Sequence, residues 1–203
     1  MTSILGTQSI QHPNGTAAAT VDASGFLTAS QPVLAKLAMT SDQNNLTEQT
    51  WTKMKLDSAV IDTKSGFNNT NDTYVIPIAG YYRIYTQAHM GVDGEVGNIR
   101  DSGICVTRTR SSTETQLAFS HNRHMDAGSQ DVDDVTERVY TIDECQAGDI
   151  ITVYVYINTD TDTAYDVFAD LDCANDNTHL NTGLPGSGDG EDTSTFVVIE
   201  RII

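Results

Sequence analysis

A regular series of short strand-like segments constrains the fold of this chain more than any other feature. About ten segments follow one another from Pro32 onward, and clusters of glycine, aspartate and asparagine separate them. The stretch Ile151–Ile157 alternates apolar and polar side chains, as a strand with one buried face does. This pattern predicts an all-β fold, an antiparallel jelly-roll sandwich. The predicted strands are Val33–Met39, Thr50–Leu56, Thr73–Ile78, Tyr81–Ala88, Gly103–Arg110, Thr115–Ser120, Thr136–Ile142, Ile150–Ile157, Tyr165–Leu171 and Thr195–Ile202.

The composition also favours strands over helices. Threonine occurs 27 times and far outnumbers leucine, and strong helix formers are sparse. No run of about 18 apolar residues occurs, so we expect no membrane-spanning helix. The first residues, MTSILGTQSIQHPNG, lack the basic and apolar regions of a secretory signal.

The net charge of −17 is concentrated in one part of the chain. From Asp126 to Asp192 there are 17 acidic residues and one basic residue, Arg138, which gives −16, and the remaining residues carry −1. This field disfavours binding to nucleic acid or to an anionic membrane. The charge suits solubility alone, or else cation binding in a salty medium.

Three cysteines, Cys105, Cys145 and Cys173, form no Cys-x-x-Cys pair, and their number is odd. A secreted disulfide scaffold of this length would have a denser and even set. We therefore expect small buried hydrophobic residues rather than a disulfide, in a protein made in a reducing cytoplasm.

Residues 1–32 differ from the rest of the chain. They hold turn signals at Asn14-Gly15 and within Val21–Thr28, and too little apolar mass for a core of their own. We predict two small extended strands here, which need a partner surface. The chain is thus expected to comprise an N-terminal attachment segment, residues 1–32, and a main domain, residues 33–203.

Three motifs, in order, resemble the signature of the C1q/TNF-like jelly-roll family. The first, Ile61–Phe67 followed by Tyr74–Ile84, is similar to the family's loop with Asp, Gly and Phe, its strand ending in Pro-x-x-Gly, and the aromatic strand after it. The second, Cys145–Val155, is similar to the family's Gly-Asp strand, and the third, Ser194–Glu200, to its last strand. The chain departs from the family by having Val-Val-Ile in place of Phe-x-Gly-x-Leu, and it lacks a collagen-like stalk.

The stretch Ile10–Gly25 is similar to short leaders that precede C1q-like domains in virion proteins of marine tailed phages. The resemblance implies a non-enzymatic structural protein of the virion surface, made in the host cytoplasm. It would be a homotrimer that decorates and stabilises the capsid or tail and attaches to other virion proteins through residues 1–32. The alternative is a tail-fibre protein whose loops bind a host-surface glycan or protein. A cellular C1q-like binding protein is a weaker third interpretation, because no secretion signal is recognised.

In the resembling family, outward aromatic side chains pack around a three-fold axis. Alternation along Tyr81–Tyr85 places Tyr82 and Ile84 inward, and the same argument applies to the strand Ile150–Ile157. We expect these two strands to be neighbours and to expose four tyrosines and one arginine together. A register shifted by one residue, which would bury one tyrosine row, is the alternative. The expected trimer interface residues are Tyr81, Arg83, Tyr85, Tyr154 and Tyr156.

Hard oxygen donors cluster in the acidic loops, and calcium prefers such ligands. The candidate calcium site is Asp160, Asp162 and Asp166, although no loop has the EF-hand order and solvated turn aspartates are the default interpretation. His121 and His124 are three residues apart, so a strand would place them on opposite faces; a polar loop is expected rather than a transition-metal site.

Enzyme motifs are not found. The chain has no Gly-x-Ser-x-Gly and no His-Glu-x-x-His, and Gly186–Gly190 lacks the Lys-Ser or Lys-Thr of a phosphate-binding loop. We expect no catalytic activity, and no cofactor apart from the candidate calcium.

Overall fold

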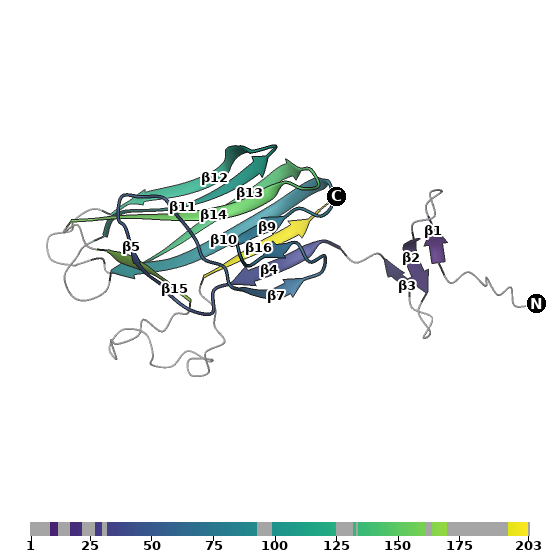
Figure 1. The fold of residues 1–203 in the computed structure, drawn as a ribbon, viewed down its shortest axis with the longest axis horizontal. Coiled ribbons are helices and arrows are strands. Elements are labelled where there is room, and N and C mark those ends of the chain that lie inside the picture. Colours follow the sequence, from purple (N-terminus) through teal and green to yellow (C-terminus); the bar gives the residue numbers. More distant parts are fainter. Residues whose placement is uncertain are drawn as a thin grey trace, which may run out of the picture. The chain divides into compact units, whose positions relative to one another are not determined.

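The computed structural model describes residues 9–11, 17–21, 27–29, 32–92, 99–124, 132, 134–160, 164–169 and 195–202. The chain forms two compact units, Met1–Pro32 and Val33–Ile203 (Figure 1). Every helix or strand among the described residues is a β-strand, so the predicted all-β class is confirmed. Within these ranges no helix is long and apolar enough to cross a membrane.

The first unit contains a three-stranded antiparallel sheet. Its strands, in spatial order, are β1 (Ser9–Gln11), β2 (Ala17–Val21) and β3 (Leu27–Ala29). The prediction of two strands is wrong by one, because β3 has only three residues and gives no clear periodic signal. The Asn14-Gly15 turn signal lies outside the described residues. So small a sheet has little apolar surface to bury and is marginal without a partner surface.

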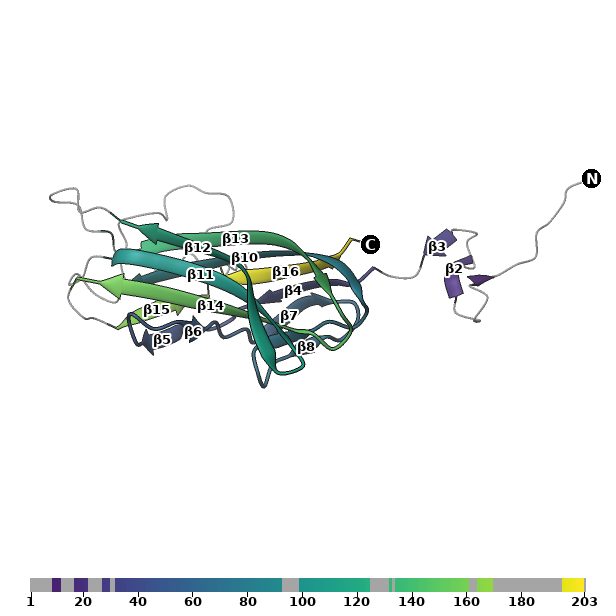
Figure 2. The ribbon, with the colours of Figure 1, turned by 90° about the horizontal axis from the view of Figure 1, so that it is seen from above.

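The second unit is a jelly-roll sandwich of two antiparallel sheets, seen in two views in Figures 1 and 2. One sheet, named here the β10 sheet, consists of β4 (Leu34–Ala38), β5 (Gln43–Leu46), β7 (Ser58–Asp62), β10 (Gly80–Val92), β13 (Asp134–Cys145), β15 (Tyr165–Phe168) and β16 (Phe196–Arg201). The other, the β14 sheet, consists of β6 (Thr52–Lys53), β8 (Phe67–Asn68), β9 (Thr73–Val75), β11 (Ile99–Arg110), β12 (Thr113–Arg123) and β14 (Ile150–Thr159).

Strands β10 and β14 organise the two sheets. β13 pairs with β10 along Gly80–Gly91, while β16 and β15 pair with successive parts of its other edge, and β4 and β7 follow β16. β11 pairs with β14 along nearly all its length, and β12 pairs with β11. β9 and β6 pair with the other edge of β14. This order determines which side chains share an outer face.

The core lies between the sheets and follows the predicted alternation. Tyr82 and Ile84 of β10 are fully buried, and so are Val155 and Ile157 of β14. Side chains from both sheets form one hydrophobic cluster. The registers of β10 and β14 are therefore as predicted, and the alternative that a tyrosine row on these strands is shifted into the core is wrong.

The main unit has 13 strands rather than about ten. The three unpredicted strands are β5, β7 and β8. β8 has two residues, β5 (QNNL) holds one large apolar side chain, and β7 shows no burial alternation because its three middle residues are exposed. β8 begins at Phe67, in a stretch for which no strand was predicted.

The loop of the first family-like motif is built around Asp62. Its carboxylate accepts hydrogen bonds from the backbone N–H groups of Lys64, Gly66 and Phe67, at 3.2, 3.2 and 2.9 Å. A Cβ at Gly66 would lie 2.5 Å from the carbonyl oxygen of Val75, so only glycine fits there. The Asp and Gly of this motif therefore have a structural role.

Candidate interaction surfaces

The outer face of the β10 sheet carries three of the predicted interface residues. Tyr81, Arg83 and Tyr85 all point away from the core, and Tyr81 is 46% exposed. Arg83 forms an ion pair with Glu200 of β16 at 3.1 Å, with both side chains about half exposed. An exposed pair of this kind contributes little to stability, but it gives the arginine a partner of opposite charge.

Neighbouring strands extend this surface with apolar side chains. Tyr85 lies directly opposite Tyr140 of β13 and Val198 of β16, and Arg83 lies opposite Ile142. Tyr140 is 52% exposed and Ile142 is 50% exposed. The Tyr85 ring packs against the Phe196 ring at 5.7 Å. We call this surface the β10 face; its apolar residues are Tyr81, Tyr85, Tyr140, Ile142, Phe196 and Val198.

The sequence did not indicate the contribution of β13. That strand has apolar side chains on both faces, since Val135 and Val139 pack on the core while Tyr140 and Ile142 face outward. Its alternation is therefore not diagnostic, and only its pairing with β10 assigns its outer side chains to this face.

Tyr154 and Tyr156 lie on a different surface. β10 and β14 belong to opposite sheets, so the prediction that they are neighbours with one shared patch is wrong. The alternation was correct for each strand, but alternation does not reveal which strands pair. Tyr154 and Tyr156 point outward from the β14 sheet, where the Tyr156 ring packs against Trp51 at 5.3 Å and His121 at 5.8 Å.

A groove runs along the outer face of the β14 sheet. Its floor follows β11, whose outward residues there, Gly103, Cys105 and Thr107, are small. One side is formed by tyrosines of β14 and the other by outward residues of β12. The groove has a volume of about 480 Å³ and is lined by Trp51, Cys105, Thr107, Glu114, Gln116, Phe119, His121 and Tyr154. We call it the β11 groove.

Two exposed aromatic rings dominate the β11 groove. Trp51, next to β6, is 42% exposed, and Phe119 of β12 is 58% exposed. The indole reaches across β14, because a Cβ built on Gly103 of β11 would lie 2.8 Å from its Cη2 atom. The glycine therefore makes room for the tryptophan, and the two rings stand on opposite sides of a floor of small residues.

A carboxylate connects the strands at one part of the β11 groove. Oε1 of Glu114 accepts hydrogen bonds from the Thr107 hydroxyl group at 2.7 Å and from the Tyr154 hydroxyl group at 3.0 Å. Burial and this hydrogen bond raise the pKa of Tyr154, and burial raises the pKa of Cys105. Both groups stay protonated at neutral pH, so Cys105 is a weak nucleophile and Tyr154 is a hydrogen-bond donor.

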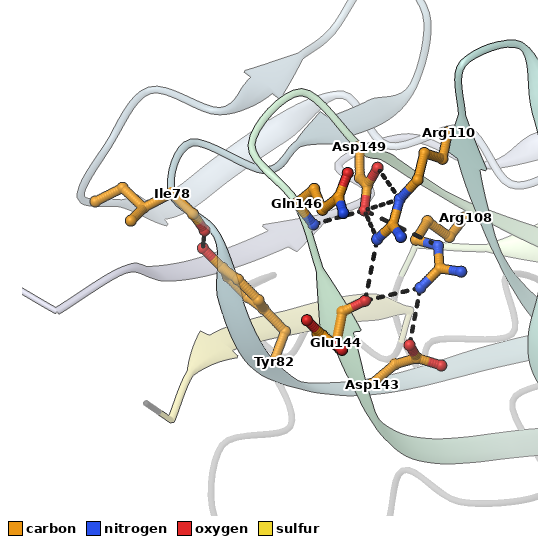
Figure 3. Close-up of polar contacts among 8 residues, drawn as sticks. All are labelled: Ile78, Tyr82, Arg108, Arg110, Asp143, Glu144, Gln146 and Asp149. Atoms are coloured by element: carbon orange, nitrogen blue, oxygen red, sulfur yellow. Dashed lines mark hydrogen bonds and ion pairs between the residues drawn. The ribbon is translucent and has the colours of Figure 1, made fainter.

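The two sheets are linked at one end by an ionic cluster (Figure 3). Arg108 of β11 binds Asp143 of β13 at 2.8 Å, and Arg110 binds the buried carboxylate of Asp149 at 2.7 Å. The hydrogen bond from Arg110 lowers the pKa of Asp149, which also accepts from the N–H of Gln146 at 2.7 Å. Asp149, the aspartate of the second family-like motif, thus connects β11 to the turn that follows β13.

A second polar network links the sheets through Glu137 of β13. Its buried carboxylate accepts hydrogen bonds from Ser102, Ser120 and Asn122, and Ser102 also contacts Nε2 of His124 at 2.8 Å. These residue types occur in hydrolytic triads, but here the carboxylate contacts the serine rather than the histidine. Ser102 is also fully buried, so the arrangement does not present a nucleophile.

The positions of the histidines and cysteines agree in part with the predictions made from the sequence. His121 lies on the outer face of the β14 sheet, and His124 reaches the buried Ser102. The two histidines therefore lie on opposite faces, as predicted for a strand. The expected polar loop is wrong for His121, which lies in β12. Cys105 and Cys145 are free and buried, as predicted, and Cys173 lies outside the described residues. Burial raises the pKa of Cys145 to about 11.

The candidate calcium ligands are not brought together in the described part of the chain. Asp162 lies outside it, and Oδ1 of Asp166 in β15 accepts a hydrogen bond from the N–H of Asn45 at 2.6 Å. Asp160 is exposed at the end of β14. Among the residues that the structure describes, no group of three His, Cys, Asp or Glu residues is arranged to hold a metal ion. Calcium at this loop stays a prediction, which melting temperatures with calcium and with a chelator would test.

Solved structures of TNF proteins share this fold. Eiger TNF from S. frugiperda superposes with a TM-score of 0.54 at 10% sequence identity, covering 85% of this chain and 94% of that one. Murine APRIL at pH 5.0 superposes with a TM-score of 0.52 at 14% identity, covering 85% of this chain and all of that one. No family model and no curated protein matches the chain. The TNF-like jelly-roll fold is thus confirmed, at identities that carry the fold alone.

Proposed function

We propose that this protein is a structural component of a virion surface, made in the host cytoplasm. In this proposal it forms a homotrimeric jelly roll through the β10 face, decorates the capsid or tail, and attaches to other virion proteins through residues 1–32. The observation that carries the proposal is the exposed apolar β10 face on a chain with a net charge of −17.

The β10 face has the composition of a protein interface. Tyr85, Tyr140 and Val198 form a continuous row across three strands, with Ile142 beside Tyr140. Contiguous exposed apolar side chains on a soluble domain mark interaction sites, and tyrosine is enriched at the centres of interfaces. A second copy of the same face is a fitting partner, and the family resemblance supports three copies.

The N-terminal unit supports the attachment role. Its three short strands offer little core, so a partner surface would supply the burial that they lack. The likeness of Ile10–Gly25 to phage leaders supports a virion as that partner. A protein that binds only the assembled shell would stabilise the shell by linkage.

Replacing one apolar residue on each outer face tests the association. We expect Tyr140→Glu to convert the trimer into monomers, because three carboxylates would be buried without partners. The matched control is Phe119→Glu, which is equally exposed but lies on the other sheet, and it should leave the molar mass unchanged. A Tyr140→Glu protein that is folded and still trimeric by light scattering would refute this interface.

Copy number tests the virion role. Quantitative mass spectrometry of purified virions from the encoding phage should detect the protein at a fixed ratio to the major capsid protein. A ratio near one trimer per capsomer indicates head decoration, and a far smaller ratio indicates a tail position. Absence from the virions would refute the proposed function while leaving the trimer intact.

A further inference from the structure

We propose that the β11 groove is a binding site for a neutral oligosaccharide. The site lies on the outer face of the β14 sheet, so it is a different surface from the β10 face, which belongs to the other sheet. The inference does not rest on the trimer, because all the lining residues belong to one chain.

The β11 groove combines aromatic faces with hydrogen-bonding groups. A pyranose ring has apolar C–H faces and a rim of hydroxyl groups. Trp51 and Phe119 offer exposed aromatic faces for the C–H surfaces. Glu114 and Gln116 offer a carboxylate and an amide for the hydroxyl groups, and both Glu114 bonds already formed use Oε1, which leaves Oε2 as an acceptor. Ligand sites typically have this mostly apolar lining with a few polar groups.

The charged groups around the β11 groove also favour a neutral ligand. Among the described residues no lysine or arginine lines the β11 groove, and Lys53, which pairs with Tyr154, donates to the carbonyl group of Asn71 at 3.0 Å. The lining includes one carboxylate, Glu114. A sulfated, phosphorylated or carboxylated sugar would therefore be repelled, and so would a nucleic acid.

A cationic ligand is less well matched than a neutral one. A quaternary ammonium group also binds aromatic faces. The lining offers a single carboxylate, Glu114, whose Oε1 already accepts two hydrogen bonds and whose Oε2 alone remains for a ligand. The lining beside Trp51 and Phe119 is otherwise uncharged or imidazole, which suits a ligand that hydrogen-bonds along its length.

The shape of the β11 groove suits a short linear ligand. The volume of about 480 Å³ lies within the range of small-ligand sites. The small outward residues of β11 follow one another along the strand, between the bulkier rows of β14 and β12. A linear chain of a few sugar units fits such an elongated floor better than a compact ligand does.

Trp51 is the chain's single tryptophan, so its fluorescence reports directly on the groove. The full-length protein would be titrated with maltohexaose, cellohexaose, laminarihexaose, mannohexaose and chitohexaose. Sialyllactose, a heparin hexasaccharide and choline would be titrated in parallel. We expect a saturable change in fluorescence with at least one neutral sugar, in the millimolar range or tighter.

Calorimetry on variants locates the site. Trp51→Ala and Phe119→Ala should each weaken the affinity by about tenfold or more, because each removes one aromatic face. Phe119 is 58% exposed, so Phe119→Ala should keep the melting temperature of the parent. Trp51→Ala also loses the contact with Tyr156, so a modest fall in its melting temperature is expected, and its folding is checked by circular dichroism. The matched control is Tyr140→Ala on the β10 face, which should not change the affinity. Gly103→Ala should also weaken binding and shift the Trp51 emission, since the new methyl group displaces the indole.

Two results of the titrations would overturn the inference: no binding of any neutral sugar in the set, or tighter binding of choline or of an acidic sugar than of every neutral sugar. Sugar binding that survives both aromatic replacements would also overturn it. None of these results depends on the molar mass. Conversely, a monomeric Tyr140→Glu protein that still binds the sugar would show that sugar binding does not require the trimer.

Discussion

Asp149 is the residue through which one end of the sandwich responds to pH. Its pKa lies below the ordinary value of 3.8, first because Arg110 donates a hydrogen bond to it. The folded protein therefore binds this proton less readily than the unfolded chain does. The stabilisation that ionised Asp149 gives the folded protein is complete above pH 3.8. It is lost as the pH falls through the pKa of Asp149 in the folded protein, which is lower than 3.8.

Asp149→Asn should lower the free energy of unfolding by about 1–3 kcal/mol at neutral pH, because a buried charge-assisted hydrogen bond is weakened. The difference from the parent should shrink below pH 3.8, as Asp149 of the parent becomes protonated. Urea unfolding at a series of pH values measures both effects. Asp143→Asn is the matched control, with a smaller expected loss because that carboxylate is more exposed. Equal losses for the two variants would contradict this assignment.

The direction in which a side chain points was largely predictable from the sequence, but the residues beside it on neighbouring strands were not. Alternation correctly oriented Tyr82 and Ile84 inward and Tyr81 outward. It could not place Tyr154 on a different surface from Tyr81, because pairing between strands is decided by contacts distant in sequence. The β11 groove was missed for the same reason: Trp51, Phe119 and the small floor residues come from different strands.

Two glycines in the turns and loops between strands should differ in how much an alanine replacement lowers the free energy of unfolding. Gly148, between β13 and β14, has a φ of +89°, and a Cβ there would have no neighbour within 4 Å. Gly148→Ala should therefore destabilise by the conformational cost alone, about 1–3 kcal/mol. At Gly66 a Cβ would meet backbone oxygen at 2.5 Å, so Gly66→Ala should cost more. Thermal unfolding of both variants ranks them, and a smaller loss for Gly66→Ala would contradict the packing described for that loop.

Long strands were predicted well and short ones were not. β10 and β14 have 13 and 10 residues, and their periodicity is sustained over many side chains. β8, with two residues, forms because the Asp62 loop positions it, a tertiary cause that leaves no periodic signal. β7 is an edge strand, and its exposed middle residues hide its strand character.

At the scale of the whole molecule, the two outer faces of the sandwich have different chemistry. The β10 face has a continuous apolar row, which fits a second copy of the chain. The β11 groove has aromatic rings separated by a floor of small residues, with a few hydrogen-bonding groups beside them, which fits a small hydrated ligand. The family resemblance of the sequence predicted self-association. The prediction assigned the tyrosines of β10 and β14 to one surface, and for that reason the β11 groove was not predicted.

The molar mass of the full-length protein in solution tests the central claim, self-association through the β10 face, most directly. Light scattering coupled to size-exclusion chromatography, at micromolar concentration and neutral pH, would measure it. We expect three chains of 22.0 kDa, a mass of 66 kDa, that persists on dilution. A mass of 22.0 kDa at every concentration would contradict it, because the exposed apolar row would then have no partner of its own kind.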